Sequence, residues 1–200
     1  MFRKFIANQF KKPAGLFGRF TSNLMIKNNY HNYEMMIREL DVHSGEKIFE
    51  IGYGPGIGLN MLASKCSDCK VYGLDFSYLM YQKATKRNRA FIDKGQMKLE
   101  FGDFLKHTFV EKDFDKIFCL NVIYFWNELQ TPFEKVFSLL KQEGIFCIYM
   151  NSKENLIKMK APDPVFNKYA VEHVQTALTS AGFTAVSNRY EKGYYVRAVK

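Results

Sequence analysis

The sequence predicts an α/β fold with a seven-stranded, mostly parallel sheet. Strand-like apolar runs alternate with helical stretches through most of the 200 residues, and a cluster of glycines directly follows the first run. Alternating strands and helices pack as a parallel sheet with right-handed crossovers. A chain of this length can bury one full core. We therefore expect a single domain over 1–200, with 1–44 as a helical cover and 45–200 as the α/β core.

The first strand and the turn after it form the most informative stretch. Residues 47–51 are mostly apolar, Gly52, Gly54 and Gly56 alternate through the turn, and residues 59–63 have helical character. Glycine permits unusual backbone angles, and it has no Cβ to obstruct a ligand that lies against the turn. The helix N-terminus beyond the turn offers free N–H groups and partial positive charge. The stretch therefore predicts a site for a nucleotide-like ligand.

The glycine spacing argues against a nicotinamide oxidoreductase. The dinucleotide fingerprint is G-x-G-x-x-G, and its third glycine would fall on Ile57 or Leu59. Here the glycines alternate instead, and an acid, Glu50, stands near the end of the preceding strand. An ordinary glycine-rich connection does not need this arrangement.

The remaining elements are expected in alternating order. Further strands are predicted at residues 71–75, 97–101, 114–121 and 144–150, with a terminal hairpin at 182–186 and 194–199. Helices are predicted at residues 21–40, 77–93, 133–141 and 166–180, with a loop from 151 to 164. Asp75 ends the second strand about 20 residues after the glycine turn, a spacing at which a strand-end acid can meet a ribose.

Taken together, these features resemble the class I S-adenosylmethionine-dependent methyltransferases. The stretch Glu-Ile-Gly-Tyr-Gly-Pro-Gly at residues 50–56 resembles the family's first motif, and Asp75, Asp103 and Asn121 follow at later strand ends. The resemblance covers nearly the whole chain and implies a Rossmann-like, doubly wound sheet. Residues 13–15 and 28–31 are also similar to a small-molecule branch that includes ubiquinone- and menaquinone-biosynthesis-like enzymes.

The resemblance implies S-adenosyl-L-methionine as the cofactor and S-adenosyl-L-homocysteine as the product. Asp75 would accept hydrogen bonds from the ribose hydroxyls, and Asp103 would accept one from the adenine amine. Asn121 would face the transferring methyl. The full set of expected cofactor-binding residues is Glu50, Gly52, Tyr53, Gly54, Gly56, Asp75, Phe76, Met80, Gly102, Asp103, Phe104 and Asn121.

The acceptor is expected to bind where the fourth strand ends. Methyl transfer depends mainly on aligning two ligands and excluding water, and a general base is needed only for a protonated acceptor. His31 and Tyr124 are the expected catalytic residues, with His107 as a further candidate base. The expected substrate-binding residues are Tyr30, His31, Tyr124 and Trp126. The aromatic run at 124–126 favours a small acceptor that is aromatic or lipid-like.

Two alternatives remain open: a methyltransferase acting on RNA or protein, and a non-catalytic module that binds S-adenosylmethionine. Residues 121–124 lack the prolines of the Asn/Asp-Pro-Pro-Tyr signature of amino-directed enzymes. The net charge is +9, but the basic residues are spread along the chain, which argues against nucleic acid as a partner.

Composition also bears on location and on metal binding. Basic and apolar residues in 1–20 leave a peripheral membrane contact open, whereas the absence of a long apolar run or a signal peptide favours the cytoplasm. Cys66 and Cys69 form a C-x-x-C pair without a second ligand pair. We expect reduced, structural cysteines and no metal. The sequence does not determine the oligomeric state.

Overall fold

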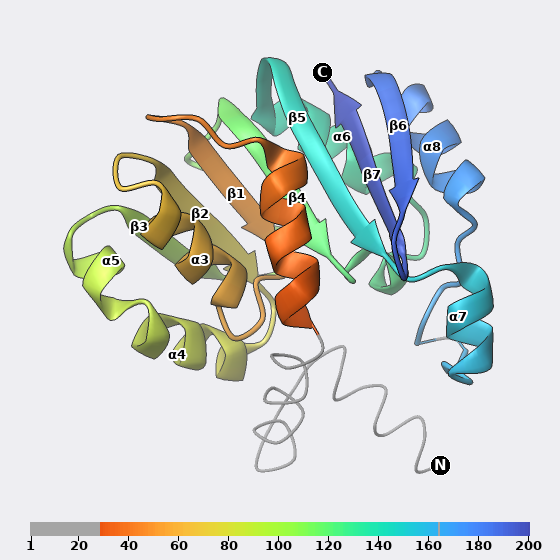
Figure 1. Cartoon of the computed structure of the whole chain (residues 1–200), viewed down its shortest axis with the longest axis horizontal. Helices are drawn as coiled ribbons and strands as arrows, with labels where there is room; N and C mark the ends of the chain where they lie inside the picture. The colour runs from red at the N-terminus through yellow and green to blue at the C-terminus, as the bar shows by residue number, and fades with distance from the viewer. Residues whose placement is uncertain (1–28, 164) are drawn as a thin grey trace.

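The computed structural model describes residues 29–163 and 165–200. Over this part of the chain the strands form a seven-stranded sheet in the order β3-β2-β1-β4-β5-β7-β6 (Figure 1). All neighbouring strands are parallel except β7, which is antiparallel to both β5 and β6. The predicted sheet with its C-terminal antiparallel hairpin is confirmed. The strands are β1 (Lys47–Ile51), β2 (Lys70–Asp75), β3 (Met97–Phe101), β4 (Phe114–Leu120), β5 (Leu140–Met150), β6 (Thr184–Tyr190) and β7 (Tyr194–Val199).

Helices cover both faces of the sheet (Figure 1). The helix over residues 29–40 lies on one face with α3 and α4, and α6 and α8 lie on the other. Strand alternation fills the two cores, since Ile48 of β1 belongs to the first and Phe49 to the second. The named helices are α3 (Ile57–Lys65), α4 (Tyr78–Arg87), α5 (Arg89–Asp93), the short η1 (Ile123–Phe125), α6 (Gln130–Leu139), α7 (Lys153–Lys158) and α8 (Val171–Ser180).

Several boundaries differ from the predicted ones; β6, for example, runs on to Tyr190, and α6 begins at Gln130. The helix expected over 77–93 is interrupted at Asn88, whose buried side chain donates to the carbonyls of Gly56 and Ala84, both at 3.0 Å. Strand β5 begins four residues early, at Leu140, directly after α6. Helix α8 begins only at Val171, because the segment before it is bonded to the loop after β4, where the Tyr169 hydroxyl donates to the Trp126 carbonyl at 2.7 Å.

The predicted contact between the basic N-terminal segment and a membrane falls on residues 1–28, which lie outside the described residues. The same holds for the start of the helix predicted from residue 21 and for residues 13–15. Among the helices that the structure does describe, none combines the length and the apolar character needed to cross a bilayer.

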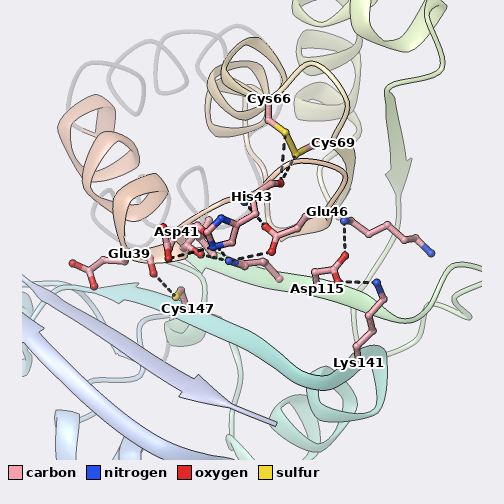
Figure 2. Close-up of polar contacts among 12 residues, drawn as sticks. Glu39, Asp41, His43, Glu46, Cys66, Cys69, Asp115, Lys141 and Cys147 are labelled. Carbon is pink, nitrogen blue, oxygen red and sulfur yellow. Dashed lines mark hydrogen bonds and ion pairs between the residues drawn. A yellow bond between two sulfur atoms is a disulfide. The ribbon is translucent and has the colours of Figure 1, made fainter.

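Charged side chains hold together the edge of the sheet where the parallel strands begin. The Lys116 side chain is buried, and its ammonium donates to the carbonyls of Leu40, at 2.6 Å, and of Asp41. A cation is favourable there because Leu40 ends the 29–40 helix, where carbonyl groups lack helical partners. Asp115 accepts from the Lys47 backbone N–H and from the Lys141 ammonium, each at 2.7 Å (Figure 2). These contacts fix the helix and three strand starts relative to one another.

The expectation of reduced thiols at Cys66 and Cys69 is wrong, because the two are joined in a disulfide (Figure 2). Cys66 caps α3 in an extended conformation, so the chain turns back and the two Cα atoms lie 5.4 Å apart, within disulfide range. Asp68 lies beside both sulfurs, but neither disulfide sulfur is a thiolate ligand, and the absence of a metal stays a prediction. Cys119 and Cys147 are free and buried.

A buried hydrogen bond ties the 29–40 helix to the first strand. The Tyr33 hydroxyl donates to Glu50 Oε1 at 2.9 Å, and both side chains are buried. Burial raises the pKa of the Glu50 carboxyl to about 8, while the Tyr33 hydrogen bond acts in the opposite direction. Burial disfavours the charged form of a carboxyl, so the folded protein holds the Glu50 proton more tightly than the unfolded chain does.

We predict that Glu50 makes stability fall as pH rises from about 5 to about 8. A carboxyl whose folded pKa is raised is protonated in both states below its unfolded value, so its ionisation opposes folding only above that value. Relative to Glu50→Gln, the wild-type free energy of unfolding should decrease by about 2–4 kcal/mol over this range. Urea unfolding at several pH values measures the difference.

Tyr33→Phe provides the matched variant, because it removes a hydrogen bond that favours the ionised carboxylate. Its stability should fall more steeply with pH than that of the wild type. A wild-type free energy of unfolding that runs parallel to that of Glu50→Gln would contradict the shifted pKa.

Candidate functional site

A cavity of about 830 Å³ opens at the carboxyl ends of β1, β2, β3, β4 and β5. Its walls come from the glycine turn, the loops after these strands, the start of the 29–40 helix, residues between 156 and 162, and Phe166. Ligands of α/β sheets bind outside the carboxyl ends of the strands, and the volume is in the range of small-molecule sites. The cavity is therefore the candidate functional site.

The glycine turn has the backbone that the sequence predicts. Gly52, Gly54 and Gly56 have φ values of 72°, 53° and 76°, a region that side chains with a Cβ rarely adopt. Gly52 and Gly54 line the cavity, whereas Gly56 does not. Gly56 caps α3, and a Cβ there would lie 2.7 Å from the Cβ of Ala84 on α4. Its missing side chain lets two helices approach each other.

Asp75, at the end of β2, binds the glycine turn directly. Its Oδ2 accepts from the Gly54 backbone N–H and its Oδ1 from that of Ser77, both at 2.8 Å. The side chain lines the cavity but is only 6% exposed. Burial raises the pKa of Asp75 to about 6, and the Ser77 and Gly54 N–H groups act against this rise. Each oxygen has a further lone pair, which a ribose hydroxyl could use.

The residues expected around the adenine also meet at the cavity. Asp103 follows β3, and its Oδ1 accepts from the Leu105 backbone N–H at 2.9 Å. The ring of Phe104 is buried, with its centroid 5.9 Å from that of Trp126. The expected residues on this part of the wall are Phe76, Met80, Gly102, Asp103 and Phe104.

Glu50 and Tyr53 are expected at the cofactor but lie outside the cavity wall. Glu50 points into the core towards Tyr33, and the Tyr53 hydroxyl donates to the Glu100 carbonyl at 3.0 Å. Both side chains are fully buried. They support the glycine turn from its core side, away from the cavity.

Asn121, directly after β4, has a φ of 59°, which is unusual for a residue other than glycine. Strained residues of this kind concentrate at functional sites. Its side chain joins a network of amides in the cavity wall: Nδ2 donates to Asn29 Oδ1, and Oδ1 accepts from Asn151 Nδ2, both at 3.2 Å. The Tyr124 hydroxyl also donates to Asn121 Oδ1, at 3.0 Å.

Some of the residues expected to bind the acceptor line the cavity, and others do not. His31, Tyr124 and Trp126 line the cavity. Tyr30 is half exposed and does not line it, because helical rotation directs its neighbours Asn29 and His31 there instead. His107, the further candidate base, is also absent from the wall and contacts Glu100 at 2.7 Å.

His31 and Tyr124 differ in their exposure and in the hydrogen bonds that they can make. The His31 Nε2 atom lies 2.9 Å from Glu191 Oε1, and the side chain is half exposed. Burial raises the pKa of the Tyr124 phenol far above its ordinary value. Tyr124 therefore stays neutral near pH 7 and remains a hydrogen-bond donor, whereas the His31 ring nitrogens donate or accept according to the tautomer.

Several wall residues were not predicted from the sequence. Asn151 follows β5 as Asn121 follows β4, so the same strand-end rule could have identified it. No local pattern indicated the rest of the wall, which comes from the 29–40 helix, from β5, from α7 and the segment between α7 and α8, and from the hairpin turn. The missed residues include Asn29, Asn32, Tyr149, Asn151, Leu156, Lys158, Met159, Lys160, Phe166 and Lys192.

Comparison with known proteins agrees with the geometry of the turn. A family model described as a methyltransferase domain matches residues 48–144. The chain is 25% identical to the uncharacterized methyltransferase YdaC of Bacillus subtilis over 131 residues, which cover 66% of this chain and 70% of that protein. It is 22% identical to the sterol 24-C-methyltransferase erg6 of Aspergillus fumigatus over 165 residues, 76% of this chain and 44% of that one. The chain thus spans less than half of this longer relative.

A solved structure shares the fold. Phosphoethanolamine N-methyltransferase 2 of Haemonchus contortus, in complex with S-adenosyl-L-methionine, superposes with a TM-score of 0.72 at 15% identity, over 86% of this chain and 52% of that one. The alternating glycines and the strand-end acid Asp75 fit the S-adenosyl-L-methionine site that a methyltransferase domain implies. Residues 48–144 therefore match the methyltransferase-domain family, and the described chain has the fold of the class I S-adenosylmethionine-dependent methyltransferases.

Proposed function

We propose that this protein methylates a small, aromatic or lipid-like acceptor, which binds in the same cavity as the cofactor. The observation that carries the proposal is that one cavity contains both the turn bonded to Asp75 and an aromatic wall formed by Tyr124, Phe125 and Trp126. A cavity of this size suits a small molecule better than RNA or a protein surface. The relatives named for sterol and phosphoethanolamine methylation are consistent with such an acceptor.

The cofactor would lie along the carboxyl ends of β1, β2 and β3. Asp75 would accept from the ribose hydroxyls, Asp103 from the adenine amine, and Gly52 and Gly54 would leave room for the methionine portion. Glu50 would act indirectly, by anchoring the strand before the turn through its hydrogen bond from Tyr33, since its side chain does not reach the cavity. When bound, the cofactor supplies a methyl group on a sulfonium for in-line displacement.

The acceptor would lie against the loop after β4. The Tyr124 hydroxyl, which donates to Asn121 Oδ1 in the free protein, would turn to donate to the acceptor, while the Asn151 backbone N–H would hold the phenol oxygen in place. His31 would take a proton from an acceptor that arrives protonated. We further propose that residues 1–200 act as one domain, because the 29–40 helix supplies both core packing and part of the cavity wall.

The first test of the proposal compares the thermal stability of the protein with S-adenosyl-L-homocysteine and with NAD. S-adenosyl-L-homocysteine at about 100 times its Kd should raise Tm by roughly 5–10 °C, since a ligand that binds only the folded state stabilises it by mass action. NAD should give no comparable shift, because the glycine spacing does not match a dinucleotide site. Equal shifts with both, or none with either, would contradict the proposed site.

The second test separates the two acids. Asp75→Asn should weaken S-adenosyl-L-homocysteine binding about 10- to 100-fold, the scale of hydrogen bonds to a charged group. Asp103→Asn should reduce the affinity for S-adenosyl-L-homocysteine by a smaller factor, because the adenine amine offers a single contact and the apolar wall remains. Isothermal calorimetry measures both, and wild-type affinity in Asp75→Asn would refute the ribose contact.

The pKa of Asp75 gives the same experiment a pH dependence. The folded pKa is raised to about 6, so the carboxyl is protonated below that pH and accepts hydrogen bonds less strongly. Wild-type affinity should therefore fall as pH decreases from 7 to 5. In Asp75→Asn, which has no proton to gain, the affinity should change much less.

The third test concerns the acceptor side. His31→Gln and Tyr124→Phe should reduce methyl transfer by at least about tenfold, in line with the loss of a proton acceptor or an orienting donor. Cofactor affinity should stay within about twofold of wild type. Transfer is measured with labelled cofactor against quinone precursors, phenols and lipids, with RNA as the contrasting acceptor. Labelled RNA without any labelled small molecule would overturn the proposed acceptor class.

A further inference from the structure

The charged groups that line the cavity are separated by sign. Among the described lining residues, the carboxylates are Asp75 and Asp103, at the ends of β2 and β3. The ammonium groups are Lys158, at the end of α7, Lys160, just beyond it, and Lys192, in the turn between β6 and β7. Negative charge therefore lies at the proposed cofactor end, and positive charge lies at the rim of the acceptor end.

These lysines are not neutralised by the acids near them. Within the described part of the chain, no carboxylate oxygen lies within 4.0 Å of the Lys160 or Lys192 ammonium. Glu191, next to Lys192, instead contacts His31 and Arg189, both at 2.9 Å. Asp163, close to Lys160 in sequence, pairs with Lys168.

Lys158 is less free than the other two lysines. Glu154 lies one helical turn before it on α7; a backbone hydrogen bond and the Ser152 side chain are the main causes that lower the pKa of that carboxyl, and the Lys158 charge adds to them. The positive charge available to a ligand at this rim is therefore that of Lys160 and Lys192.

The backbone brings the two lysine-bearing segments together. The Asn155 side chain on α7 donates from Nδ2 to the Lys192 carbonyl at 3.2 Å. Lys160 and Lys192 have φ values of 52° and 59°, and this left-handed conformation is uncommon for residues other than glycine or asparagine. Both exposed side chains lie at one rim of the cavity.

Apolar surface lies on the same side of the cavity. Leu156, Met159 and Phe166 belong to the lysine-bearing segment and also line the cavity. The Phe166 ring centroid lies 6.0 Å from that of Tyr124 and 5.2 Å from that of Phe125. The acceptor end therefore offers an apolar wall next to a positive rim, which is complementary to an amphiphile with an anionic group.

We propose that the methyl acceptor carries an anionic group, a phosphate or a carboxylate, which Lys160 and Lys192 hold at the rim while its apolar part packs against Tyr124, Phe125 and Phe166. This inference rests on the proposed function of the cavity and specifies its substrate class. Ammonium groups bind such oxyanions through charge-assisted hydrogen bonds. The anionic group would fix the orientation of the acceptor relative to the cofactor end.

The single tryptophan of the chain provides a direct probe, because Trp126 lines the cavity. Protein saturated with S-adenosyl-L-homocysteine is titrated with octyl phosphate, with octanoate and with 1-octanol, while Trp126 fluorescence is followed. The two anions should bind about five- to tenfold more tightly than the alcohol with the same chain length, as expected for two partly solvated ion pairs. Equal affinity for the anions and the alcohol would overturn the proposal.

Lys160→Gln/Lys192→Gln should abolish the preference for the anions and leave 1-octanol binding unchanged. The matched control is Lys65→Gln/Lys94→Gln, which removes two exposed lysines that do not line the cavity. The control should retain the preference, since it lowers the net charge by the same amount. An equal loss of the preference in both double variants would attribute it to overall charge and refute the rim site.

Inorganic phosphate distinguishes a free anion from the head of an amphiphile. At an ionic strength matched with potassium chloride, it should compete with octyl phosphate for wild-type protein and not for Lys160→Gln/Lys192→Gln. The absence of competition in wild type would contradict an anion subsite. If S-adenosyl-L-homocysteine itself fails to bind, the proposed function fails; if it binds and the anion preference is missing, only the acceptor class fails.

Discussion

The Asp75 carboxylate is the interaction on which the arrangement of the site depends. It accepts the backbone N–H groups of Gly54 and Ser77 at the same time, so one side chain at the end of β2 joins the glycine turn after β1 to the start of α4. An ionised carboxylate makes stronger hydrogen bonds than a neutral group, but burial raises its pKa to about 6. The same group is thus close to losing its charge and is positioned to bind a ribose.

The two edges of the sheet differ in the kind of interactions they contain. Where the parallel strands begin, Lys116 and Asp115 are saturated by backbone and side-chain partners, and their contacts hold a helix and strands in place. Where the strands end, the wall contains a buried acid, an asparagine with positive φ and lysines without nearby carboxylates within the described residues. Such unsatisfied or strained groups cost stability, and they persist at functional sites because ligands complete them.

Hydrogen bonds from a distant segment hold the loop after β4, whose regular structure is limited to the short helix η1. The Asn167 side chain donates to the carbonyls of Tyr124, at 3.0 Å, and Trp126, at 2.7 Å. The Tyr169 hydroxyl donates to the same Trp126 carbonyl. The segment before α8 therefore supplies the hydrogen bonds that the loop after β4 cannot make internally. Preorganised aromatic walls reduce the ordering cost of binding a second ligand.

The sequence alone determined the sheet, the glycine turn and the strand-end residues Asp75, Asp103 and Asn121. These depend on local spacing and on the rule that parallel strands end at one edge, so they can be predicted without knowing what packs over them. Only the tertiary structure decided that Glu50, Tyr53 and Gly56 face the core, that Tyr30 lies off the wall, and that Cys66 meets Cys69. It also decided that Lys160 and Lys192 share a rim with Tyr124. Strand and helix periodicity gives each side chain a direction, but contact between distant segments depends on long-range packing, which no local pattern encodes.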